Sequence, residues 1–317
     1  MKRFFTVLNE RFFSTTHQVQ RIVIWTAIVL VAAVVSFGSY YYYDRYYAAQ
    51  PTVQEMSLEE AEQAVRDAPD NPENRLKLAE AYLFYRRFDD AINQALLVKE
   101  LYPDNLGADF VLGVAYANNG NPSLALDPLI RFIESRKDEE MAALDQRLQA
   151  SLYYLGDSYL QLGRPQEAIE PLEITVNFVQ TDADSIYKLG LAYAGVQRYE
   201  DAIAAFRRAV AFVPNYTEVY ESMSQVYLAQ NMTVEADYAE AMVSFSKKDY
   251  ATAYEKLTVV VQEKPAFAPA FTGMGMTCEA QGNLECALSS YQAAAALDPT
   301  DMTASQGVQR VQLAMQK

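Results

Sequence analysis

Side chains that commonly perform catalysis are scarce in this sequence. The chain of 317 residues contains one histidine, His17, and two cysteines, Cys278 and Cys286. A histidine-dependent triad or a His/Cys metal cluster therefore has no basis in the main body of the chain. We expect no enzymatic activity, no metal site and no cofactor.

Two patterns that resemble catalytic motifs have simpler interpretations. The stretch GMGMTC from Gly273 begins like a nucleotide-binding loop, but it lacks the last glycine and the preceding strand of that motif. Acidic pairs such as Asp89-Asp90 and Glu139-Glu140 are typical of turns and exposed helix faces. Cys278 and Cys286 flank the stretch QGNLE. If the domain lies in an oxidising compartment, a disulfide between them is one interpretation, and two small core thiols are the alternative.

Composition narrows the class of partner. The net charge is −15, which argues against nucleic acid because phosphate binding needs a basic stripe. Hydrophobic residues make up 51% of the chain, enough to bury a large core.

An uncharged apolar stretch near the N-terminus predicts a transmembrane helix over residues 22–43. The sequence IVIWTAIVLVAAVVSFGS begins at Ile22 and forms a helix of about 27 Å, close to the thickness of a bilayer core. Trp25 lies near one end and YYYYDRYY follows at the other, where aromatic rings favour lipid headgroups. A cleaved signal peptide fits less well, because the leader of residues 1–21 and the apolar stretch are both long.

The basic residues predict the orientation of this helix. Lys2, Arg3, Arg11 and Arg21 precede it, whereas acidic residues dominate the segment that follows it. The positive-inside rule therefore places the leader in the cytoplasm. A linker over 44–54 and a domain over 55–317 are expected outside the cell membrane.

The larger domain repeats itself. SLYYLGDSYLQLGRPQEAIEPLEIT begins at Ser151, and SIYKLGLAYAGVQRYEDAIAAFRRA begins 34 residues later at Ser185. Both contain Leu-Gly, a Tyr three residues after the Gly, and an Ala nine residues after the Tyr. This spacing resembles the tetratricopeptide repeat, a unit of two antiparallel helices. The resemblance implies an all-α solenoid, with a small residue at position 8 of each unit and large residues at positions 7, 11 and 24.

Six units keep the register, and polar helices close both ends of the array. They begin at Pro72, Leu106, Gln149, Ala183, Val234 and Ala268. Two steps are irregular. Nine extra residues separate the second and third starts, which predicts lengthened helices around RKDEEMAALDQRLQ. A seventh start at Thr217 lies only 17 residues before Val234, so the segment 232–247 is either shared between two units or a single helix.

In this family the first helix of each unit lines a concave groove, and positions 2, 5, 9, 12 and 13 face it. Those positions give the candidate partner-binding residues Phe110, Val114, Tyr153, Leu160, Tyr187, Leu191, Tyr238 and Met242. None of these positions carries Lys or Arg, so the basic clamp of carboxylate-binding family members is absent. An apolar or aromatic partner segment is expected, with Tyr153, Tyr187 and Tyr238 as anchors. Alternatively, some of these side chains pack against neighbouring repeats.

The sequence as a whole predicts a membrane-anchored scaffold whose extracytoplasmic groove holds a partner protein. The resemblance to membrane-anchored members of the family implies a role in assembling a membrane or envelope complex. Two alternatives remain: an accessory subunit of a membrane, photosynthetic or respiratory complex, and a self-assembling surface or filament protein.

Overall fold

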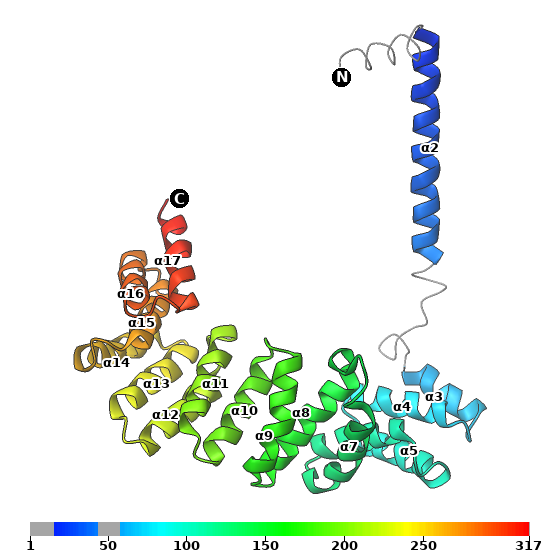
Figure 1. Ribbon diagram of the computed structural model, residues 1–317, viewed down its shortest axis with the longest axis horizontal. Helices are drawn as coiled ribbons and strands as arrows, with labels where there is room; N and C mark the ends of the chain where they lie inside the picture. The colour runs from blue at the N-terminus through cyan, green and yellow to red at the C-terminus, as the bar shows by residue number, and fades with distance from the viewer. Residues whose placement is uncertain (1–15, 44–57, 317) are drawn as a thin grey trace. The chain divides into compact units, whose positions relative to one another are not determined.

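The computed structural model describes residues 16–43 and 58–316, and all regular structure in them is helical (Figure 1). The predicted all-α class is confirmed for these residues. Residues 1–15 of the predicted leader and the whole predicted linker, 44–54, lie outside the described residues.

Helix α2 (Thr16–Tyr43) contains the apolar stretch. Its side chains are described over 23–37, and all of them are exposed. Within the part of the chain open to description, no helix combines the length and the apolar composition of a membrane span.

Residues 61–317 form a separate compact unit built from helix pairs. The cap helix α3 (Leu58–Asp67) precedes these pairs and packs against the first of them. The hydroxyl of Tyr82 donates to Glu62 at 3.1 Å, and Asn74 donates to the Ala64 carbonyl at 3.0 Å. The helices that follow are α4 (Pro72–Phe84), α5 (Phe88–Leu101), α6 (Leu106–Asn118), α7 (Pro122–Arg136), α8 (Gln146–Gln161), α9 (Pro165–Phe178), α10 (Ala183–Gly195), α11 (Tyr199–Phe212), α12 (Thr217–Ala229), α13 (Thr233–Ser246), α14 (Tyr250–Glu263), α15 (Ala268–Ala280), α16 (Leu284–Leu297) and α17 (Met302–Met315).

A single turn type joins the first helix of each unit to the second. The residue at position 15 of each unit adopts a positive φ, and the residue directly after it donates its N–H to a carbonyl five residues back, as Arg198 does to Tyr193 at 2.9 Å. This is a left-handed helix cap, which glycine adopts with the least strain. Glycine occurs at only three of these turns; the others carry Arg86, Gln197, Asn231 and Lys248.

The turns settle the irregular register around residues 232–247. A left-handed cap follows α12 at Asn231, and another follows α13 at Lys248. Helix α13 is therefore the second helix of one unit and the first helix of the next, and it packs against both α12 and α14. This is the sharing that the 17-residue step left open.

Small residues let paired helices approach closely. A Cβ built on Gly156 would lie 2.4 Å from Leu172 Cγ, and one built on Gly190 would lie 2.5 Å from Phe206 Cε1. These glycines stand at position 8 and their contacts at position 24. The small-to-large pairing expected from the repeat is thus present in the packing.

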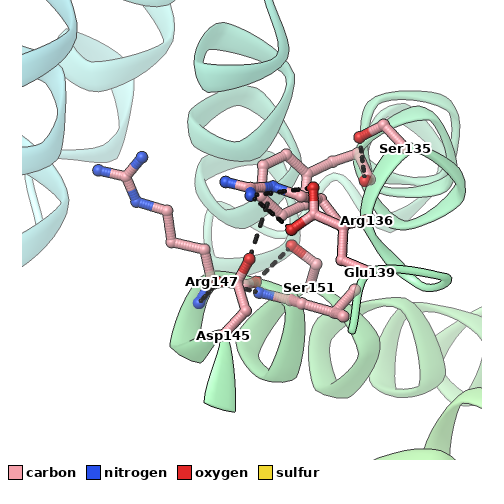
Figure 2. A network of polar contacts seen from close by, with 8 residues as sticks. Ser135, Arg136, Glu139, Asp145, Arg147 and Ser151 are labelled. Carbon is pink, nitrogen blue, oxygen red and sulfur yellow. Dashed lines mark hydrogen bonds and ion pairs between the residues drawn. The ribbon is translucent and has the colours of Figure 1, made fainter. Parts of the chain in front are cut away.

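Only some of the nine extra residues between the second and third units are helical. Helix α7 ends at Arg136, a 3₁₀ turn covers Ala142–Leu144, and α8 starts three residues before the repeat register. Asp145 accepts from the N–H groups of Arg147 and Leu148 at the start of α8, and Arg136 lies 3.5 Å from its carboxylate (Figure 2). Lengthened helices were predicted here, and α8 is indeed longer by three residues at its start. The rest of the insertion is a turn rather than a helix, and Asp145 caps α8 by satisfying its first free N–H groups.

Candidate functional site

First helices of neighbouring units pack directly on one another, from α4 to α6 and on to α8, α10 and α12. Second helices of neighbouring units do not approach each other comparably in the described array. The layer of first helices is therefore the more tightly curved, inner layer. We call its accessible side, on α4, α6, α8, α10 and α12, the inner face.

Most of the predicted groove residues on the inner face keep part of their surface accessible. Half-buried side chains are Phe110, Tyr153, Leu160, Tyr187 and Leu191, and Val114 is buried. Together they form a row of apolar and aromatic side chains across three helices, α6, α8 and α10. Such side chains favour an apolar or aromatic ligand.

Asp184 joins two tyrosines from neighbouring units on this face. The hydroxyl of Tyr153 on α8 donates to one carboxylate oxygen of Asp184, and the hydroxyl of Tyr216 donates to the other at 2.7 Å. Burial, with the hydrogen bond to Asp184 second, raises the pKa of both tyrosines well above the usual value of 10. Both phenols are therefore neutral donors at physiological pH.

Further polar contacts connect successive first helices. Tyr187 on α10 lies 3.2 Å from the Ser222 hydroxyl on α12, and its ring centroid lies 5.3 Å from that of Tyr216. Lys188 on α10 lies 2.6 Å from the Asp157 carboxylate on α8. These contacts hold the aromatic side chains in fixed orientations before any ligand binds.

Arg147 was not identified from the sequence, yet it reaches across the inner face. From the first turn of α8 its guanidinium lies 2.6 Å from Glu80 on α4 and 5.6 Å from the Phe110 ring centre on α6. Burial raises the pKa of Glu80, and Arg147 lowers it by a smaller amount. Arg147 lies in the extension of α8, before the first position of the repeat unit that starts at Gln149. Glu80 lies 67 positions earlier in the chain. The repeat positions therefore could not predict this pair.

The two candidates on the shared helix α13 are buried. Tyr238 is 7% exposed and Met242 is 1% exposed. The space beside Gly273 on α15 is filled by Met242 and Tyr238, because a Cβ there would lie 2.6 Å from Met242 Sδ. Both side chains thus form part of the α13–α15 packing and offer little surface to a ligand.

Cys278 and Cys286 are joined by a disulfide that connects α15 to α16. The pair is therefore a disulfide in the structure rather than two free core thiols. Within the described residues, no group of three or more His, Cys, Asp or Glu side chains is arranged to hold a metal ion.

Three tetratricopeptide repeat models match the chain, over residues 76–136, 150–177 and 183–216. The chain is a tetratricopeptide repeat protein. The matched ranges include α6, α8 and α10, so the residues of the inner face stand on helices that belong to repeat units. The matches bear out the repeat units predicted from Pro72, Leu106, Gln149 and Ala183.

Individual proteins are similar to this chain over limited lengths. The peroxisomal targeting signal receptor of Komagataella phaffii is 27% identical over 157 residues, which is 49% of this chain and 27% of the receptor. The solved structure of MamA from Desulfovibrio magneticus is 20% identical, covers 56% of this chain and 96% of its own, and has a TM-score of 0.48. The structure of Cut9-Hcn1 is 17% identical, with 79% and 44% coverage and a TM-score of 0.41.

Proposed function

We propose that this protein is a membrane-anchored scaffold whose inner face holds an apolar or aromatic segment of a partner protein outside the cytoplasm. The observation that carries the proposal is the row of half-buried apolar side chains on α6, α8 and α10. The tyrosine, aspartate and lysine contacts between units keep that row ordered, which reduces the entropy lost on binding. Few cations on the face remain unpaired, so an acidic tail is a poorer ligand than an apolar segment.

Site-specific photo-cross-linking in native membranes tests the inner face. A cross-linker at Leu191 is compared with one at Leu96, which is 46% exposed on the second helix α5. Recovery of one partner at a fixed ratio from Leu191, and not from Leu96, is the expected result. Cross-links from Leu96 alone would favour the accessory-subunit alternative, and links between identical chains would favour self-assembly.

Anchoring by α2 is supported by the exposed apolar side chains at 23–37 and by the basic residues that precede the helix. A charge in the centre of a membrane helix costs about 3 kcal/mol. Val29→Arg is therefore expected to release a substantial part of the protein into the carbonate-soluble fraction, while Val29→Leu stays in the pellet. Equal fractionation of the two variants would remove the anchor from the proposal.

A further inference from the structure

A cavity lies between α7, α8 and α9, on the side of the second helices and away from the inner face. Helices α7 and α9 form its walls and α8 forms its floor, and its volume is about 530 Å³. We call it the outer groove; its apolar lining includes Ile130, Ile133, Leu148, Leu152, Ile174 and Phe178.

The outer groove lies at the irregular seam of the array. Elsewhere four residues connect a second helix to the next first helix, as in 179–182 between α9 and α10. Between α7 and α8 the connection covers 137–145, and Asp138 from this segment lines the groove. The nine-residue insertion is therefore part of the cavity wall, and the groove is not a general property of the repeat.

The groove is apolar inside and acidic at its rim. Leu148 and Leu152 are fully buried beneath it, whereas Ile130 is 36% exposed and Ile174 and Phe178 are half-buried. The rim carries four carboxylates, listed here as Glu134, Asp138, Glu167 and Glu170. Such a surface binds apolar side chains below and cations above.

Two of the rim carboxylates form ion pairs, and the other two have Lys137, which also lines the groove, as a more distant cationic neighbour. Glu134 lies 2.7 Å from Lys137, and Glu167 lies 2.9 Å from Arg164. Asp138 and Glu170 are exposed, and within the described residues neither has an ion-pair partner. The rim therefore keeps a net negative charge that a basic ligand would neutralise.

A backbone acceptor adds to this chemistry. Pro171 stands inside α9 and lines the groove, and it has no N–H to donate. The carbonyl of Glu167, four residues earlier, consequently lacks its usual donor within the helix. A lysine or arginine of a ligand can donate to this oxygen as well as to the carboxylates.

We propose that the outer groove binds an amphipathic helix of a partner protein, with Leu, Ile or Phe on one face and Lys or Arg along its edges. The walls α7 and α9 have 15 and 14 residues and are each about 21–23 Å long, enough to flank three or four turns of a helix. A helix that lies in such a groove buries one apolar stripe, which matches the narrow apolar floor. The acidic rim would repel the anionic headgroups of a membrane surface.

A fluorescent reporter in the groove tests the proposal on the full chain. The only two cysteines are joined in the disulfide, so Ile174→Cys introduces a unique thiol for a bimane label. Leu97→Cys is the matched control, because Leu97 occupies the same repeat position on α5 and is 40% exposed. The labelled proteins are held in phosphatidylcholine nanodiscs under non-reducing conditions and titrated with a 14-residue Leu/Lys amphipathic peptide and with its Leu/Glu counterpart.

The expected result is a saturable change in bimane fluorescence at position 174 with the Leu/Lys peptide and none at position 97. Asp138→Asn with Glu170→Gln should weaken binding by about three- to tenfold, since each removed surface charge pair contributes a few-fold at most. Glu200→Gln with Glu255→Gln, at positions that are exposed on α11 and α14, removes the same total charge and should have little effect. Equal responses at positions 174 and 97, equal responses to the two peptides, or equal effects of the two double variants would each overturn the proposal.

Discussion

Replacing Asp184 by alanine removes the acceptor that Tyr153 and Tyr216 share on the inner face. A hydrogen bond to a charged group contributes about 1.5–3 kcal/mol. Both tyrosines are only half-buried, so water replaces part of each lost bond, and the low end of that range applies. Two bonds therefore predict a loss of about 2–3 kcal/mol in the region of α8, α10 and α12.

Asp184 also stands in the first turn of α10, where a negative charge interacts favourably with the helix dipole by about 0.5 kcal/mol. Glu218→Ala measures that contribution alone, because Glu218 occupies the same first-turn position of α12 and is exposed. The difference between the two variants isolates the tyrosine bonds.

Native-state hydrogen exchange is the appropriate assay, because repeat arrays unfold in segments and a single melting temperature averages over them. Amides of α8, α10 and α12 should exchange faster in Asp184→Ala, while those of α4 and α5 stay unchanged. Tyr153→Phe should destabilise the wild-type background by about 1 kcal/mol and the Asp184→Ala background by nearly nothing.

Two results would refute this account of the inner face. One is an Asp184→Ala variant that exchanges no faster than Glu218→Ala. The other is a full additional loss from Tyr153→Phe on top of Asp184→Ala, which would mean that the two side chains act independently.

Three other predictions concern the packing between helices. Gln197→Gly should raise the free energy of unfolding by about 0.5–1 kcal/mol, because the φ of 63° at this position suits glycine. Gln197→Ala keeps the backbone strain and should give no such gain. Urea denaturation of both variants measures the difference. Gly190→Ala should cost about 1–3 kcal/mol by overpacking against Phe206, and Phe206→Leu should recover part of that loss in the double variant. Arg310 donates hydrogen bonds of 2.6 and 2.7 Å to the Glu279 carboxylate and lowers the pKa of that carboxyl. The stability that this ion pair contributes is therefore present above pH 4.5, and it is lost as the pH falls through the folded-state pKa of Glu279. Arg310→Gln should make acid unfolding of α15–α17 less steep below pH 4.5, as measured by circular dichroism; an unchanged profile would contradict the assignment.

The sequence alone determined the repeat architecture. Leu-Gly at positions 7 and 8 and Ala at position 20 recur every 34 residues, because each unit must solve the same packing problem between its two helices. Gly190 and Phe206 illustrate why such a pattern can be read directly: the contact is local, within one unit, and it repeats. The positions of Phe110, Tyr153, Tyr187 and Leu191 on first helices followed from the same periodicity.

Only the tertiary structure decided the contacts between repeat units, which the periodicity of the sequence does not specify. The shared role of α13 depends on two left-handed turns that non-glycine residues, Asn231 and Lys248, adopt only under the constraint of the surrounding helices. The burial of Tyr238 depends on α15, and the Arg147–Glu80 pair joins helices two units apart. Each of these features arises between units, where the curvature of the array and the length of a connection set the contacts. A repeat pattern specifies each unit from within, so the grooves that form between units depend on three-dimensional packing.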